Sequence, residues 1–239
     1  MNKERLKTGL EMMGVAADET ALDRFEAFHA ILDEYNARMD LTAVLDEDER
    51  VDRHDLDSAA PLAHGLLVQG AKVIDVGTGA GFPGMPLLIL RPDLQITFLD
   101  ALNKRILFLE DALKRLGLTA ATLHARAEDA AKMAAHREQY DAAVSRAVAN
   151  AATLEELTLP FVKKGGVAIA WKGPGVADEL TAARRAAFLL GGTVRGTVDA
   201  PIPRRADWAH VLLLTDKTGT TPKAYPRKAG TPNRKPLGQ

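Results

Sequence analysis

Mostly apolar side chains recur at three- and four-residue steps near the start of the chain. Between residues 20 and 39 these positions are occupied by Leu22, Phe25, Phe28, His29, Leu32, Tyr35 and Met39. This spacing predicts a helix with one apolar face. Residues 58–68 show a second, shorter helical pattern. We therefore expect residues 1–70 to form a mainly helical extension.

The pattern changes after residue 70. Short apolar or alternating runs predict strands at 72–76, 95–100, 121–125, 140–145, 166–171 and 208–215. Helical patterns separate them at 83–90, 103–116, 150–158 and 176–190, with Asn103 as an N-cap and Gly117 as a terminator of the second. Such alternation predicts an α/β fold with a mostly parallel sheet and helices on both faces. We expect a core over 71–216 and a basic tail over 217–239.

Composition excludes several classes of protein. The chain has 239 residues, 46% hydrophobic and 26% charged, and contains no cysteine. Disulfides, thiolate zinc sites and cysteine nucleophiles are excluded, and we expect no metal site. No apolar run approaches the ~18 residues of a membrane span. The charged amino terminus lacks the apolar centre of a signal peptide, so we expect a cytoplasmic protein.

The formal net charge of −1 hides a polar distribution. Residues 1–60 carry 16 acids and 7 bases, whereas residues 217–239 carry six bases and no acid. A basic tail is typical of an arm that binds an anionic partner, most often nucleic acid. It is also typical of a solvated, disordered terminus. Composition leaves both interpretations open.

The stretch VIDVGTGAGFPG, residues 73–84, joins the first predicted strand to its helix and fits two templates. Gly79, Gly81 and Gly84 match the dinucleotide signature G-x-G-x-x-G. Gly77, Gly79 and Gly81 match G-x-G-x-G, preceded by Asp75. In both templates an acid about 20 residues further on binds ribose hydroxyls, and Asp100 ends the next predicted strand.

Three details favour S-adenosyl-L-methionine over NAD as the ligand of this loop. Pro83 and Pro86 leave fewer backbone donors for a pyrophosphate at the helix start. The Asp75 carboxylate can order the loop and face a cationic amino-acid tail. About 70 helical residues precede the first strand. The alternatives are an NAD-dependent oxidoreductase, although no Tyr-x-x-x-Lys pair is present, a cofactor-binding RNA chaperone without turnover, and a tight turn without ligand.

Several further motifs carry a resemblance to one family. VIDVGTGAGFPGMPL, FLDALNKRILFL, ARAED and VSRAVA, with YNARMDLTAV and RHDLDS upstream and YPRKAGTPNRKPL at the end, occur in this order. Over residues 20–237 the chain resembles the bacterial ribosomal RNA small-subunit methyltransferase G family, also called the glucose-inhibited division protein B family. The resemblance implies a Rossmann-like class I S-adenosylmethionine methyltransferase with a seven-stranded, mostly parallel sheet. It also implies methylation of N7 of one guanine in 16S ribosomal RNA.

The resemblance implies roles for individual residues. Gly77 and Phe82 would line the cofactor, Ala127 and Glu128 would hold its adenine edge, and Arg146 would lie at the cofactor site. The residues themselves allow alternatives: Glu128 as an acid favoured at a helix start, and Arg146 as a phosphate contact or a surface arginine. Two departures from the family pattern are Asp40, usually asparagine in an N-L-T motif, and Asp55, usually apolar.

Guanine N7 has a free lone pair, so methyl transfer to it needs alignment rather than a general base. His54 and Asp57 are weak catalytic candidates. For His54 we prefer a role in a hydrogen-bonded network that joins the N-terminal helices to the sheet. The carboxylate of Asp57 or Glu128 would stabilise the cationic product. Pyrimidine C5 methylation normally uses a cysteine, and amino-group methylation typically uses an Asn/Asp-Pro-Pro-aromatic stretch where this chain has SRAVAN.

The expected partner is 16S ribosomal RNA or the small ribosomal subunit, bound by a monomer. Contacts with RNA phosphates are expected from six basic residues, some in the tail and others near the carboxyl ends of strands: Lys104, Arg105, Arg126, Lys172, Arg227 and Lys228.

Overall fold

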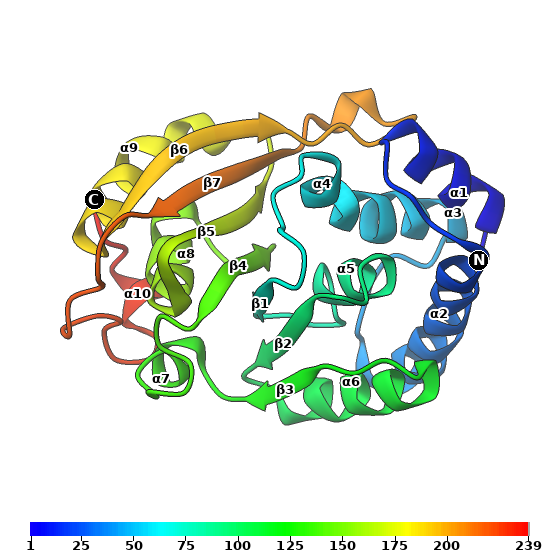
Figure 1. Ribbon diagram of the computed structural model, residues 1–239, viewed down its shortest axis with the longest axis horizontal. Helices are drawn as coiled ribbons and strands as arrows, with labels where there is room; N and C mark the ends of the chain where they lie inside the picture. Colours follow the sequence, from blue (N-terminus) through cyan, green and yellow to red (C-terminus); the bar gives the residue numbers. More distant parts are fainter. Residues whose placement is uncertain (239) are drawn as a thin grey trace.

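Buried strands alternate with helices to give a three-layered α/β fold in the computed structural model, which describes residues 1–238 (Figure 1). The strands are β1 (Lys72–Val76), β2 (Gln95–Asp100), β3 (Ala121–His124), β4 (Tyr140–Arg146), β5 (Val162–Lys172), β6 (Gly192–Asp199) and β7 (Val211–Lys217). The helices are α1 (Lys3–Met12), α2 (Glu19–Met39), α3 (Glu47–Arg50), α4 (Asp57–Ala63), α5 (Gly84–Leu90), α6 (Asn103–Leu116), α7 (Ala127–Ala130), α8 (Ala151–Thr158), α9 (Val176–Leu189) and α10 (Thr231–Arg234).

The seven strands form one sheet in the order β3-β2-β1-β4-β5-β7-β6. All pairings from β3 to β5 are parallel, and β7 runs antiparallel to both β5 and β6. The predicted seven-stranded, mostly parallel sheet is confirmed. Its topology brings the carboxyl ends of β1, β2, β4 and β5 to one edge, where open α/β sheets bind ligands.

Helices cover both faces of this sheet. On one side α2, α5 and α6 pack together over β1 and β2 (Figure 1). Their interface buries the aromatic rings of Phe25, Phe28, Phe98 and Phe108 completely. On the other side α8 and α9 pack together over β4, β5 and β6, around Phe161. Burial of these rings stabilises the layers by roughly 1.5–3 kcal/mol for each side chain.

The N-terminal helices are joined to the rest of the chain by buried charges. Between α3 and α4, residues Val51–Leu56 form a π-helical turn, a feature often found at functional sites. In this turn the fully buried Asp52 accepts hydrogen bonds from Arg5 of α1 and from Arg205 of the β6–β7 loop. Burial opposes ionisation, but these two guanidinium groups outweigh it and lower the pKa of Asp52.

The basic tail is ordered over residues 217–238. Lys217 is fully buried, with its Nζ 2.8 Å from the Leu159 carbonyl and 3.0 Å from Glu138. The Arg227 guanidinium binds the buried Glu156 carboxylate through Nε and Nη2, at 3.0 and 2.6 Å. These contacts show that the interpretation of the tail as a disordered terminus is wrong for the part of it that the structure describes.

Several local expectations differ from the structure. Asn103 is the first residue of α6 rather than its N-cap, which is Leu102 without a side-chain cap bond. The strand predicted at 166–171 begins earlier, at Val162, and this longer β5 carries a register irregularity against β4. Strand β6, with the sequence GTVRGTVD, is an edge strand of alternating exposed and partly covered residues, so it lacks an apolar run.

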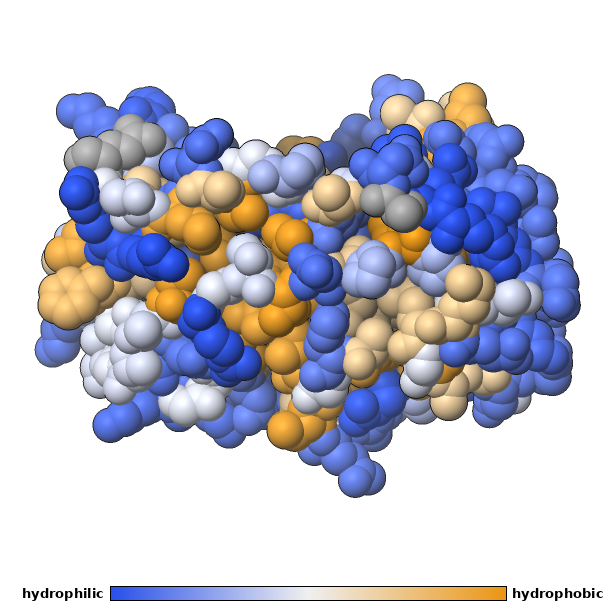
Figure 2. All heavy atoms as spheres, turned by 90° about the horizontal axis from the view of Figure 1, so that it is seen from above, coloured by the Kyte–Doolittle hydropathy of each residue, from blue (hydrophilic) through white to orange (hydrophobic). Residues whose placement is uncertain are grey.

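The face that carries β6 is shown in Figure 2, which looks down on the molecule of Figure 1 from above. Hydrophobic residues form a band near the middle of this face, and the side that carries α1 and the β6–β7 loop is mostly hydrophilic.

Within residues 1–238, no helix combines the length and apolarity that crossing a membrane requires. The same residues place no three His, Asp or Glu side chains in a metal-binding group.

Candidate active site

The glycine-rich loop between β1 and α5 is fastened at both ends by one buried carboxylate. The Asp75 Oδ2 accepts hydrogen bonds from the Thr78 hydroxyl at 2.6 Å and from the Gly84 backbone N–H at 2.9 Å. A Cβ at Gly84 would lie 2.7 Å from this oxygen and 2.5 Å from the Phe98 ring. Burial raises the Asp75 pKa to about 6. Asp75 therefore orders the loop, and its side chain is fully buried beneath it.

A cavity of about 490 Å³ opens above this loop, within the size range of small-molecule sites. The main chain at Gly77 and Gly79, both with positive φ, forms its floor. The ends of the neighbouring strands β2 and β4 and the segment after α2 also line it. The cavity is lined by Leu41, Thr42, His54, Gly77, Thr78, Gly79, Ala80, Phe82, Asp100, Ala101, Leu102, Arg105, Arg146, Ala147 and Val148.

Asp100 at the end of β2 faces this cavity and holds its rim. Oδ2 accepts from the Gly79 N–H at 3.0 Å and lies 3.2 Å from Nη1 of Arg105, while Oδ1 accepts from the Leu102 N–H at 2.8 Å. A carboxylate held in place by backbone donors is suited to accept from ribose hydroxyls. Arg105, predicted to bind RNA, instead lines the same cavity as Asp100.

Arg146 at the end of β4 connects the sheet to the N-terminal helices. Its Nη1 donates to the Arg53 carbonyl at 2.6 Å and to Asp57 Oδ2 at 3.0 Å, and its Nη2 lies 3.3 Å from Nδ1 of His54. The guanidinium carbon lies 5.4 Å from the centre of the Phe82 ring. Arg146 is only 13% exposed in its side chain, so it is not a free surface arginine.

His54 completes this cluster. Its ring stacks on Phe82 with centroids 4.4 Å apart, and Nε2 lies 2.8 Å from the Thr42 hydroxyl. Burial, reinforced by the charge of Arg146, lowers the His54 pKa to about 3, so the ring is neutral near pH 7. Because Nδ1 accepts from Arg146, we assign the proton to Nε2, which then donates to Thr42. The expected network between the N-terminal helices and the sheet is present.

A second cavity of about 480 Å³ adjoins the first and shares His54, Arg146 and Ala147 with it. Asp57 lies in this cavity, with its carboxylate held between Arg146 and Nδ1 of His210, the latter at 3.1 Å. Trp171 forms a wall and donates from Nε1 to the Asp57 carbonyl at 2.8 Å. Two cavities that meet at one charged cluster provide separate places for a cofactor and a substrate.

Three predicted cofactor residues are not among the described residues that line the first cavity. A Cβ at Gly81 would contact Leu109 and Met85 of the core, so this glycine allows close packing under the loop. Ala127 and Glu128 begin the short helix α7. The Glu128 carboxylate accepts from the Gly230 N–H at 2.7 Å and so binds the tail.

The predicted RNA-binding residues have diverse surroundings. Lys104, Arg126 and Lys228 are exposed. Lys172 borders the second cavity, where its Nζ is bound to Glu179 at 2.8 Å and to the Ala149 carbonyl. Arg227 is bound to Glu156. The structure brings Lys172 to the candidate site, whereas Arg227 lies in the tail interface.

Both departures from the family pattern have a local structural explanation. Asp40 ends α2 in the left-handed conformation, with φ +49°, and Asp shares with Asn a tolerance of this conformation. Asp55 is fully buried, and its Oδ2 lies 2.8 Å from Nε2 of the buried His29 on α2. The aspartate that replaces an apolar residue is therefore matched by a buried histidine.

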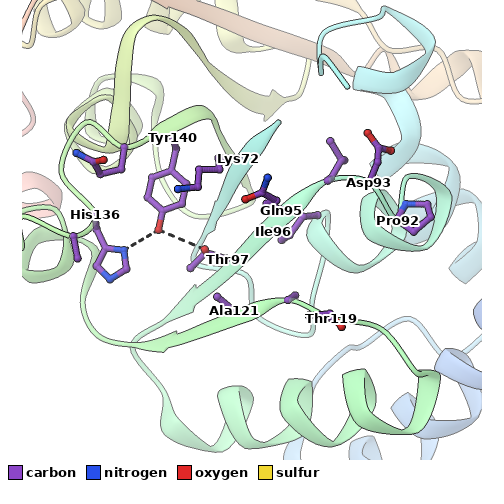
Figure 3. Close-up of a pocket in the computed structure, with 14 residues that line it drawn as sticks. Lys72, Pro92, Asp93, Gln95, Ile96, Thr97, Thr119, Ala121, His136 and Tyr140 are labelled. Carbon is purple, nitrogen blue, oxygen red and sulfur yellow. Dashed lines mark hydrogen bonds between the residues drawn. The ribbon is translucent and has the colours of Figure 1, made fainter. Parts of the chain in front are cut away.

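Another hollow, of about 460 Å³, lies at the opposite, amino-terminal edge of the strands (Figure 3). There the Tyr140 hydroxyl joins Nδ1 of His136, at 2.8 Å, to the Thr97 hydroxyl, at 3.4 Å. The glycine loop, Asp100 and Arg146 are absent from the described residues that line it. Its chemistry is unlike that of the two cavities at the carboxyl edge.

Solved structures of similar fold support the assignment of the fold. One is the Methanococcus jannaschii fibrillarin pre-rRNA processing protein, with a TM-score of 0.52 and 16% identity, matching 67% of this chain and 74% of its own. Another is P. horikoshii TYW2, solved in complex with MeSAdo, with a TM-score of 0.55 and 14% identity, matching 75% and 67%. The expected Rossmann-like class I methyltransferase fold is confirmed.

Comparison of sequences is more specific. A family model described as rRNA small subunit methyltransferase G matches residues 21–204. The protein of that name from Alkaliphilus metalliredigens is 42% identical over 237 residues and 99% of both chains. The protein of that name from Clostridium perfringens strain 13 is 41% identical over 233 residues and 97% of both chains. These matches show that the chain belongs to the rRNA small subunit methyltransferase G family.

Proposed function

We propose that this protein transfers a methyl group from S-adenosyl-L-methionine to N7 of one guanine in 16S ribosomal RNA. The observation that carries the proposal is the junction of the two cavities at His54 and Arg146, at the carboxyl edge of the sheet. Membership of the family supports the enzyme class. We place the reaction in the cytoplasm, where a monomer meets the RNA or the small ribosomal subunit.

The residues around the first cavity fit an S-adenosylmethionine molecule. The main chain at Gly79 leaves room for a ligand, since an added Cβ there would meet only the Gly77 carbonyl oxygen, at 4.0 Å, whereas the Val148 side chain packs against Gly77. Asp100 would accept from the ribose hydroxyls, and Phe82 and Arg146 would line the side next to the second cavity. We keep contacts of Ala127 and Glu128 with the adenine edge as part of the proposal. When bound, the cofactor supplies an electrophilic methyl group on a sulfonium.

The second cavity would hold the target guanine. N7 attacks with its own lone pair, so the site needs no proton acceptor. The His54 ring fits this requirement, because it is neutral and both of its nitrogens are engaged by Arg146 and Thr42. Alignment of the reacting atoms can supply roughly 7–11 kcal/mol of the barrier at best.

Asp57 is suited to stabilise the product. Methylation at N7 leaves a positive charge on the base, and the Asp57 carboxylate already binds two cationic or polar partners at the wall of this cavity. A fixed carboxylate near developing positive charge lowers the energy of the transition state without reorganisation. We assign this role to Asp57 rather than Glu128, whose carboxylate binds the tail.

The proposal is tested by incubating the protein and tritiated S-adenosylmethionine with undermethylated small subunits and with naked 16S ribosomal RNA. Borohydride reduction followed by aniline cleaves RNA at N7-methylguanosine and maps the product. We expect one cleavage site. Gly77→Arg should abolish transfer, because a Cβ there lies 2.8 Å from Val148 and φ is +72°. Gly175→Arg is the matched control, since Gly175 faces open space at φ −73°.

Three outcomes would contradict all or part of the proposal. Calorimetric binding of NADH without binding of S-adenosylmethionine would support the oxidoreductase alternative. Binding of S-adenosylmethionine and RNA without incorporation of tritium would support a cofactor-binding chaperone. Tritium on a base other than guanine would keep the enzyme class and overturn the assigned atom.

A further inference from the structure

We infer that Trp208 and Arg53 form a stacking platform for an unpaired RNA base that flanks the target guanine. The inference rests on the proposed function and extends it from the second cavity, which Arg53 lines, to Trp208 beside it. The ligand class is a single-stranded segment of RNA, with one base on the indole and its phosphate near the arginine.

The β6–β7 loop places Trp208 beside the guanine cavity. Strand β7 begins at Val211, which pairs with Lys172 at the end of β5, so residues 200–210 project from the carboxyl edge of the sheet. Figure 1 shows this loop between the end of β6 and the start of β7. His210, at the end of the loop, lines the second cavity together with Arg53.

Two guanidinium groups lie over the indole of Trp208. The Arg53 Cζ is 4.3 Å and the Arg205 Cζ is 4.9 Å from the ring centre. Trp208 is half-buried, and the His210 ring lies 5.6 Å away. Stacked arginines mark an aromatic face that accepts planar, positively charged or π-rich groups. Nucleobases stack on such faces irrespective of their sequence.

The two arginines are held differently. Arg205 donates from Nε to the buried Asp52 at 2.7 Å, and this bond fixes its position. The side chain of Arg53 is 45% exposed, and its ion pair with Glu49 is long, at 3.5 Å. Arg53 can therefore leave the indole for a phosphate, while Arg205 stays in place. A base would then occupy the position that the Arg53 guanidinium leaves.

The backbone of Arg53 belongs to the active-site cluster, because its carbonyl accepts from Arg146. A base on the platform would thus lie next to the residue that separates the two cavities. Arg204 adds an exposed positive charge to the same loop. Of the acids beside these arginines, Asp52 is bound by Arg5 and Arg205, and Glu49 lies 3.5 Å from Arg53. The exposed Arg53 and Arg204 can bind an anionic chain, which an apolar peptide is not. The indole face then favours RNA over an acidic peptide, because RNA carries bases that stack.

The test compares Trp208→Leu, which keeps apolar volume without a π-face, with Trp208→Phe, which keeps an aromatic ring. KM and kcat are measured with undermethylated small subunits, and affinity for S-adenosylmethionine is measured by calorimetry. Phe188→Leu is the matched control, because Phe188 is 81% exposed on α9. A 16S RNA fragment with 2-aminopurine on either side of the mapped guanine reports stacking directly, through fluorescence quenching by the unaltered protein.

We expect Trp208→Leu to raise the KM for RNA roughly 5- to 100-fold, with kcat nearly unchanged. Trp208→Phe should recover most of the loss, Phe188→Leu should equal the unaltered protein, and cofactor affinity should not change. Quenching of 2-aminopurine at one flanking position should accompany binding, which also covers the case in which Trp208→Leu does not fold.

The inference is overturned if Trp208→Leu and the unaltered protein methylate RNA with the same KM. An equal rise in KM in Trp208→Leu and Trp208→Phe would show that Trp208 only holds its loop in place. That result would also overturn the inference. The absence of quenching at both flanking positions, with methylation intact, has the same consequence. Failure of the unaltered protein to methylate RNA would overturn the proposed function, and this inference with it.

Discussion

The contact between Arg227 and Glu156 allows a quantitative test of how the tail is held. Glu156 is fully buried in α8, and it accepts from the backbone N–H of Arg227 at 2.8 Å as well as from its guanidinium. The Arg227 side chain is 25% exposed. The hydrogen bonds that Arg227 donates to Glu156 raise the pKa of Arg227. Arg227→Met would remove the partner of a buried charge while keeping much of the side-chain volume.

Removal of one partner of a buried ion pair costs about 3–5 kcal/mol, because the other charge stays buried without compensation. The partial exposure of Arg227 places the expected loss in the free energy of unfolding near the lower end, at about 3 kcal/mol. In a chain of this length each kcal/mol shifts Tm by roughly 2–4 °C. We therefore expect Tm to fall by about 6–12 °C.

Scanning calorimetry measures this change. Lys228→Met, at an exposed neighbouring position, is the control and should leave Tm nearly unchanged. The double variant Glu156→Leu/Arg227→Met should regain most of the stability, because no buried charge is left unpaired. An unchanged Tm in Arg227→Met, or a double variant less stable than Arg227→Met, would refute this reasoning.

Three further predictions address individual titratable groups. Burial raises the Glu155 pKa to about 8, so the folded protein keeps a proton that the unfolded chain releases above pH 4.5. The stability of the unaltered protein relative to Glu155→Gln should therefore rise as pH falls from about 8 to 4.5, by up to about 1.4 kcal/mol per pH unit. Urea denaturation measures this difference, and the same pH dependence in both proteins would contradict it. Because the His54 pKa is about 3, kcat should show no inflection near pH 6.5, and an inflection that disappears in His54→Gln would show that the ring titrates. Asp100→Asn should weaken the binding of S-adenosylmethionine about 10- to 100-fold in calorimetry, because it removes charge-assisted acceptors from the rim; unchanged affinity would remove Asp100 from the cofactor site.

The sequence predicts the helices and strands whose own residues show a clear apolar period. Strands β1 and β2 and helix α6 have the expected bounds, because buried strands and an amphipathic helix have distinct apolar periods. Strand β6 was not predicted, since an edge strand with two glycines and alternating exposure carries no such period. The order of the tail depends on Glu156 and Glu128, which are distant in sequence, so composition could not reveal it.

The residues of the candidate site likewise fall into a group that was predicted from the sequence and a group that was not. The glycine-loop templates predicted Gly77 and Asp100, and the resemblance to the family implied Arg146; all three end or follow predicted strands, whose carboxyl ends meet at one edge. The stacking of His54 on Phe82 requires the π-helical turn to face the glycine loop, which no local pattern specifies. His210 and Trp208 were missed as site residues because they lie in a loop whose position depends on the unpredicted strand β6.

A crystal structure of the protein soaked with S-adenosylmethionine tests the central claim most directly. We predict density for the nucleoside on the main chain of Gly77 and Gly79, with its ribose at Asp100 and its methyl group directed toward the cavity of Asp57. Density in the hollow at the amino-terminal edge beside Tyr140, or a carboxyl-edge cavity closed by the protein's own side chains, would contradict the account.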